Sequence, residues 1–69
     1  MSNIEVTVNG EQREIEGGRT VLQYLESLKI VPDRVAVELN RVIVKKAEWG
    51  RTVIERGAQM EIVQFVGGG

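Results

Sequence analysis

The chain lacks cysteine and histidine entirely and contains one proline. It therefore has no disulfide framework, no thiol nucleophile, no imidazole base and no Cys/His zinc site. Carboxylates remain, but those of Glu5, Glu14, Glu16 and Glu38 are spread along predicted strands and form no credible acid–base pair. We expect no catalytic residue, no metal site and no bound cofactor, and hence a protein that is not itself an enzyme.

Length and charge narrow the possible functions further. The chain has 69 residues and a formal net charge of −1, which suits one small domain without a deep substrate cavity. A nucleic acid or an anionic membrane would require an excess of basic residues, so we expect neither as a partner. No apolar run approaches the roughly 18 residues of a membrane span, and residues 1–5 lack the pattern of a signal peptide. These features favour a cytoplasmic protein.

The N-terminal part of the sequence predicts a β-hairpin. Apolar and polar residues alternate over residues 4–8, as in a half-buried strand, and a returning strand is expected over residues 12–16. Asn9-Gly10 lies between them, and both residues tolerate the positive φ of a tight turn. The following Gly17-Gly18-Arg19-Thr20 lacks the spacing and the lysine of a phosphate-binding loop. We interpret it as a turn that leads into a helix N-cap.

A helix is predicted to begin at Thr20, because Thr20-Val21-Leu22-Gln23 fits the capping-box pattern. The predicted apolar face of this helix consists of Val21, Leu22, Leu25 and Leu28. Pro32 cannot continue the helix, and it disfavours helical geometry at Val31.

The rest of the chain predicts three more strands, over residues 34–39, 42–44 and 60–66, with a turn at Asn40-Arg41 between the first two. A short helical or 3₁₀ stretch over residues 45–49, an irregular link through 52–54 and a turn at Gly57 precede the last strand. We interpret Trp49 as a plug at the edge of the core, and the cations Lys45, Lys46 and Arg51 as solvated surface charges.

This order of elements predicts an α+β fold in which a mixed sheet of four to five strands has one main helix packed across one face. A right-handed crossover from the first hairpin to the later strands leaves few possible topologies. The β-grasp arrangement fits the element order, with the last strand beside the first in the centre of the sheet. We expect a β-grasp domain over residues 1–66 and a flexible C-terminal glycine tail over residues 67–69.

The three glycines Gly67, Gly68 and Gly69 are unusual, since chance would place three together about 3 times in 10,000. Taken by themselves, the glycines could be a frayed end or a cloning remnant. Their position directly after the apolar last strand favours a functional tail instead. Without side chains such a tail can lie extended in a narrow slot, and the residues after Phe65 reach roughly 13–14 Å. If the native chain ends at Gly69, its carboxylate is ionised at neutral pH and can attack the α-phosphate of ATP. The resulting acyl adenylate can accept sulfur without a catalytic side chain from this protein.

The sequence resembles the ThiS family, the sulfur carrier proteins of thiamine biosynthesis, over nearly its whole length. The resemblance is carried by the runs Val35-Ala36-Val37-Glu38-Leu39-Asn40, Val42-Ile43-Val44 and Glu48-Trp49, and by Glu61-Ile62-Val63-Gln64-Phe65-Val66-Gly67-Gly68-Gly69. One departure is Arg56-Gly57-Ala58, where the family usually has Gly followed by Asp. This difference should alter a surface turn and not the chemistry of the tail.

The resemblance implies a ubiquitin-like β-grasp fold and a reaction cycle. A ThiF-type adenylating enzyme would use ATP and magnesium to convert the Gly69 carboxylate into an acyl adenylate. A persulfide sulfur donor would turn the adenylate into a thiocarboxylate, and thiazole synthase would use that sulfur to build the thiazole ring of thiamine. Gly67 and Gly68 would enter the active site of each partner.

A docking surface is expected beside the tail. Val63 and Phe65 lie out of phase with Met60 and Ile62, so they should occupy the open face of the sheet if the latter pair faces the helix. Our hypothesis is that Val63 and Phe65 form an apolar patch that docks on the partner enzymes. Ordinary sheet packing and a homodimer contact are the alternatives.

Two other functions remain open. The first is the small subunit of molybdopterin synthase, of the MoaD type, which the resemblance implies would share the fold and the thiocarboxylate chemistry. The short loops and the AVELN, VIV and EW segments favour the thiamine carrier. The other alternative is a ubiquitin-like interaction module without tail chemistry.

Overall fold

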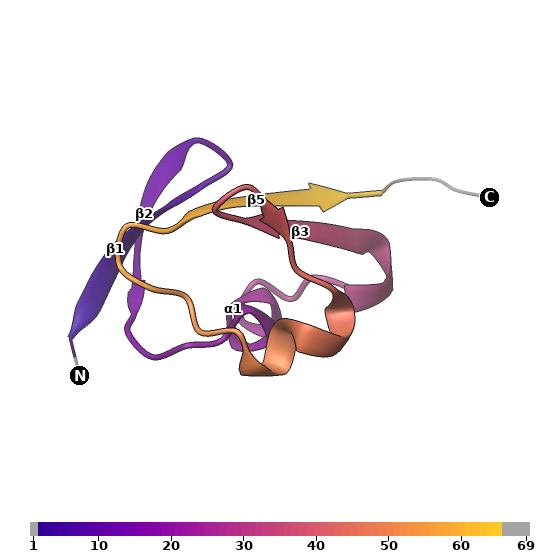
Figure 1. Ribbon diagram of the computed structural model, residues 1–69, viewed down its shortest axis with the longest axis horizontal. Helices are drawn as coiled ribbons and strands as arrows, with labels where there is room; N and C mark the ends of the chain where they lie inside the picture. The colour runs from indigo at the N-terminus through magenta and orange to yellow at the C-terminus, as the bar shows by residue number, and fades with distance from the viewer. Residues whose placement is uncertain (1, 66–69) are drawn as a thin grey trace.

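The computed structural model describes residues 2–65, which form a five-stranded sheet with a helix packed across one face (Figure 1). In chain order the elements are β1 (Asn3–Val8), β2 (Glu11–Glu16), α1 (Val21–Ser27), the 3₁₀ helix η1 (Pro32–Arg34), β3 (Val35–Leu39), β4 (Val42–Ile43), the 3₁₀ helix η2 (Lys46–Arg51) and β5 (Gln59–Gln64). The strand order is β2-β1-β5-β3-β4. β1 and β5 run parallel, and the other neighbours run antiparallel. The predicted mixed sheet, with the last strand beside the first at its centre, is confirmed.

Two-residue turns close both hairpins at the positions where turns were predicted. Asn9 and Gly10 have φ of 51° and 82°, and they connect β1 directly to β2. Asn40 and Arg41 have φ of 51° and 71°, and they connect β3 to β4. Positive φ at both central residues matches the right-handed twist of the flanking strands, which explains why asparagine and glycine suit these positions.

Helix α1 begins with the predicted capping box. The Thr20 hydroxyl accepts a hydrogen bond from the Gln23 backbone N–H at 3.1 Å, and the Gln23 side chain accepts one from the Thr20 N–H at 2.9 Å. The predicted apolar face needs one correction, because Tyr24 is buried with Val21 and Leu25 whereas Leu28 is 45% exposed. The helix ends at Ser27, before Leu28, and Lys29 then adopts a left-handed conformation. Ile30, and not Leu28, packs against the core.

The irregular segment between η2 and β5 contributes to the core, which its sequence did not predict. Its backbone is fixed beside the start of α1, since the Val21 N–H donates to the Thr52 carbonyl and the Ile54 N–H donates to the Arg19 carbonyl, both at 2.9 Å. Ile54 is consequently almost fully buried. Burial of an isoleucine of this kind contributes about 1.5–3 kcal/mol.

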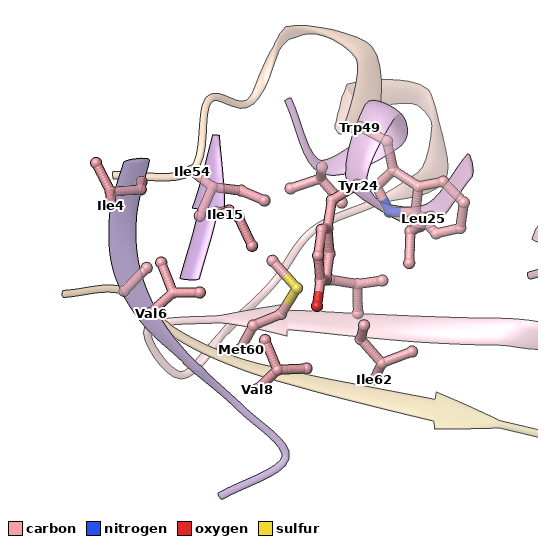
Figure 2. Packing of buried hydrophobic residues seen from close by; sticks show 13 residues of the cluster. Ile4, Val6, Val8, Ile15, Tyr24, Leu25, Trp49, Ile54, Met60 and Ile62 are labelled. Carbon is pink, nitrogen blue, oxygen red and sulfur yellow. The ribbon is translucent and has the colours of Figure 1, made fainter. Parts of the chain in front are cut away.

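The core lies between the sheet and α1, as Figure 2 shows for Met60 and Ile62, which project from β5 toward Tyr24 and Leu25. Trp49 of η2 closes one edge of this core and is 2% exposed. Its indole N–H donates to the Val44 carbonyl at 2.8 Å, so its polar atom is also satisfied. The interpretation of Trp49 as a core plug is confirmed.

Candidate functional site: the end of the central strand

The predicted docking residues Val63 and Phe65 lie in the last part of strand β5 and directly after it. β5 is the central strand, with β1 on one side and β3 on the other, and Met60 and Ile62 point into the core. Because side chains alternate along a strand, Val63 points to the opposite face, where it is 52% exposed, and Phe65, the residue after β5, is 58% exposed. The structure thus confirms that Val63 lies on the open side of the sheet and shows that Phe65 is exposed. Their role in docking remains a hypothesis.

The surroundings of Phe65 extend this apolar surface around the end of the strand. Its backbone N–H donates to the Arg34 carbonyl at 2.7 Å, which continues the pairing between β5 and β3 past Gln64. A hollow of about 190 Å³ lies beside Phe65 and is lined in part by Val31, which is 59% exposed. Sequence reasoning placed Val31 only as a helix end. The sequence does hold one indication that Val31 is exposed: it is an apolar residue beside the single proline, in the segment that connects the helix to the sheet.

The open face also carries paired carboxylates that the sequence alone did not bring together. Glu38 on β3 is directly opposite Glu61 on β5, and Glu5 on β1 is directly opposite Glu14 on β2. These pairs follow from the strand register, because the adjacent pairs Val37–Ile62 and Ile4–Ile15 face the core. Like charges in directly opposed positions destabilise a sheet. Within residues 2–65, no group of three or more acidic side chains is placed to hold a metal ion.

Two of the basic residues singled out in the sequence form ion pairs with carboxylates at the surface. Lys46 forms an ion pair with Asp33, and Arg51 pairs with Glu48 at 2.8 Å. The hydrogen bond and the positive charge of Lys46 hold the pKa of Asp33 below its ordinary value of 3.8. Both pairs are solvent-exposed, in agreement with the interpretation of these cations as surface charges.

Gly17 and Gly18, between the end of β2 and Arg19, form a turn. Gly18 has a φ of 88° and Thr20 caps α1, so the predicted turn and N-cap are confirmed. The tail residues Gly67, Gly68 and Gly69, on which the predicted chemistry depends, lie outside the described residues. No helix within residues 2–65 has the length and apolar content needed to cross a membrane.

Known proteins share this architecture. The ThiS family model matches residues 6–69. The crystal structure of the thiamine biosynthesis protein ThiS from Geobacter metallireducens superposes with a TM-score of 0.80 at 30% sequence identity, covering 96% of this chain and 100% of that one. The sulfur carrier protein ThiS of Escherichia coli is 26% identical over 66 residues, which are 96% of this chain and 100% of that protein.

A second group of relatives is much longer. Thiazole synthases from Magnetococcus marinus and Paramagnetospirillum magneticum are each 36% identical over 66 residues, or 96% of this chain. The chain spans 20% of the length of each of these two proteins. The family match over residues 6–69 and the β-grasp fold shared with the Geobacter protein place this chain in the ThiS family.

Proposed function

We propose that this chain is a sulfur carrier of thiamine biosynthesis and that its C-terminal carboxylate, at Gly69, is the group that carries the sulfur. The observation that supports this most directly is the extent of the family match, which runs through residue 69 and so includes all three glycines. The similarity to the Escherichia coli sulfur carrier over its full length supports the same function. The chemistry needs no cysteine or histidine from this chain, which has neither.

The proposed cycle makes the chain a co-substrate of other enzymes. A ThiF-type adenylating enzyme binds ATP and magnesium, and the Gly69 carboxylate attacks the α-phosphate to form an acyl adenylate and release pyrophosphate. A persulfide donor then displaces AMP and leaves sulfur on the carbonyl carbon as a thiocarboxylate once the donor's sulfur–sulfur bond is cleaved by a thiol. Gly67 and Gly68 occupy the approach to the active site because only a chain without side chains fits a narrow slot.

Thiazole synthase is the proposed acceptor of the sulfur. Two thiazole synthases contain a stretch that resembles nearly the whole of this chain, although the chain accounts for only 20% of their length. A carrier-like segment within the same polypeptide supports a working relationship between the carrier and the thiazole-forming enzyme. The exposed apolar residues Val63 and Phe65, at the end of β5, are the proposed docking patch for both enzymes.

Intact-mass measurement tests the proposal. The chain is incubated with a ThiF-type adenylating enzyme, ATP, magnesium and a persulfide donor, and the product is weighed. We expect a gain equal to the mass difference between one sulfur and one oxygen atom. A chain truncated after Gly67 is the matched control, and it should not gain this mass. If the full chain is only ever recovered unmodified, the interaction module without tail chemistry becomes the better interpretation.

A genetic test separates the two sulfur-carrier pathways. Expression of the chain should restore growth to a thiazole auxotroph that lacks its own carrier. It should not restore molybdenum-cofactor synthesis to a strain that lacks the small subunit of molybdopterin synthase. The reverse result would assign the chain to the MoaD type.

A further inference from the structure

The two sides of strand β5 are supported unequally. On one side, β3 pairs with β5 from Leu39 opposite Met60 to Val35 opposite Gln64. On the other side, β1 pairs with only the first two residues, Gln59 and Met60. β1 then turns away into its hairpin. The half of β5 that leads to the tail therefore lacks a second neighbouring strand among residues 2–65.

The side chain of Asn9 takes the place of the missing strand. Its Nδ2 donates to the Ile62 carbonyl at 3.1 Å, and its Oδ1 accepts from the Ile62 N–H at 2.7 Å. The backbone N–H of Asn9 also donates to the Met60 carbonyl at 2.8 Å. Because the N–H and C=O of one strand residue point to the same edge, the amide satisfies both backbone groups of Ile62 as a neighbouring strand would. The contact is partly buried and joins residues 53 positions apart in sequence.

The turn conformation alone does not require these bonds. Asn9 has a φ of 51°, which glycine adopts without strain, so glycine can also form this turn. What glycine lacks is the amide group that holds Ile62. This residue immediately precedes Val63, and Phe65 and the glycines follow.

We propose that Asn9 is a positioning residue for the tail reaction. It secures Ile62 from the side that β1 leaves unpaired, while β3 holds the other side, and so helps to fix the position of the strand end that precedes the tail. This inference rests on the proposed function, because it concerns delivery of the Gly69 carboxylate to the adenylating enzyme. Its loss should reduce the efficiency with which a folded carrier presents its tail.

The chain offers a matched control in Asn40. This residue also has a φ of 51° in a two-residue turn, its Oδ1 accepts from the Gln59 N–H at 2.9 Å, and its N–H donates to the Gln59 carbonyl at 2.7 Å. It therefore secures the opposite end of β5, where β1 and β3 both pair. Replacement of either asparagine by glycine keeps the turn and removes side-chain bonds to the same strand.

The experiment compares Asn9→Gly and Asn40→Gly with the unmodified chain, far below their unfolding temperatures. Backbone hydrogen exchange at Ile62 should accelerate roughly tenfold in Asn9→Gly, since two hydrogen bonds are lost, and should be little changed in Asn40→Gly. The kcat/KM for the carrier in ATP–pyrophosphate exchange by the adenylating enzyme should fall about fivefold or more in Asn9→Gly alone. Both variants should lose some global stability.

A merely structural role for Asn9 predicts that activity follows global stability in both variants. The proposal is therefore overturned if Asn9→Gly supports exchange as well as Asn40→Gly does, or if the Ile62 amide exchanges equally in the two. Should Asn9→Gly not fold, Asn9→Asp carries the same comparison, because it keeps the acceptor for the Ile62 N–H and loses the donor. Failure of the unmodified chain to support exchange would instead count against the proposed function.

Discussion

Glu38 and Glu61 face each other across β3 and β5 on the open side of the central sheet. No lysine or arginine is paired with either carboxylate within residues 2–65. The register that places these charges together is imposed by the core, because Val37 and Ile62, the next pair along, are buried on the helix side. A shift of one residue would expose that pair, so the sheet tolerates the repulsion.

Neutralising one carboxylate of this pair should therefore stabilise the fold. Glu38→Gln is expected to raise the free energy of unfolding by a few tenths to about 1 kcal/mol, the range found for cross-strand charge pairs. Urea unfolding at low salt measures the change, and the gain should shrink near 1 M salt because the repulsion is screened. Glu26→Gln, on the exposed surface of α1, is the control and should change stability little. A destabilised Glu38→Gln would show that the register does not create net repulsion.

Trp49 is predicted to stabilise the fold through its indole N–H as well as its ring. Trp49→Phe keeps an aromatic ring in the core but leaves the Val44 carbonyl without its donor. We expect a loss of about 1–3 kcal/mol in unfolding free energy, measured by circular dichroism in urea. Tyr24→Phe is the matched control, because the Tyr24 ring is buried and its hydroxyl forms no hydrogen bond with a side chain or backbone group of residues 2–65. Equal losses in the two variants would contradict a role for the indole hydrogen bond.

Local side-chain chemistry explains why much of the fold was predictable. Asn9-Gly10 allows only a narrow set of turns, and Thr20 with Gln23 forms a cap within four consecutive residues, so neither depends on distant parts of the chain. Ile54 and Leu28 depend on tertiary context instead. Ile54 is buried because its backbone bonds to the residue before the helix cap, and Leu28 is exposed because the helix ends one residue earlier.

The candidate site was predictable in part for the same reason. Strand alternation alone placed Val63 and Phe65 on the face opposite Met60, and the structure confirms this for Val63 and shows Phe65 exposed after the end of β5. The bonds from Asn9 to Ile62 could not be predicted, because they require the parallel neighbour β1 to end where it does. The opposition of Glu38 and Glu61 likewise requires the register between two strands more than 20 positions apart.

The ion pair between Asp33 and Lys46 should affect titration more than stability. The pKa of Asp33 lies below 3.8 because Lys46 favours its charged form. A depressed pKa contributes stability above the ordinary pKa, and that contribution is lost as the pH falls through the lower, folded-state value. Lys46→Gln should return the pKa of Asp33 toward 3.8, as followed by NMR titration of its carboxyl carbon. Unfolding at pH 7 should change little, because both side chains are exposed.

The neighbouring Lys45 provides the control for this titration. Its side chain forms no ion pair with the described residues, so Lys45→Gln should leave the pKa of Asp33 depressed. If both variants raised this pKa equally, the depression of the Asp33 pKa would come from the general positive charge of the surface and not from the specific contact with Lys46.

Phe65 tests whether the open face docks a partner. Its side chain is 58% exposed, so Phe65→Ala should change the free energy of unfolding by no more than about 0.5 kcal/mol. If the ring inserts into the adenylating enzyme, the same change should weaken binding about tenfold or more, as measured by calorimetry with the unmodified enzyme. Val42→Ala is the matched control, because Val42 is also an exposed apolar residue, at 65%, on edge strand β4. It is the cross-strand partner of Leu39, which packs against the core, so Val42 lies on the helix side of the sheet and not on the open face.

The alternatives for this face give different results in the same variants. If Phe65 belongs to ordinary sheet packing, Phe65→Ala unfolds at distinctly lower urea concentration and binding falls only in step with stability. If it forms a homodimer contact, light scattering shows a dimer that Phe65→Ala converts to monomer, while enzyme binding does not weaken. The docking interpretation requires loss of affinity in a stable monomer, since an exposed aromatic side chain that stabilises neither the fold nor a dimer contributes its apolar area only when a partner covers it.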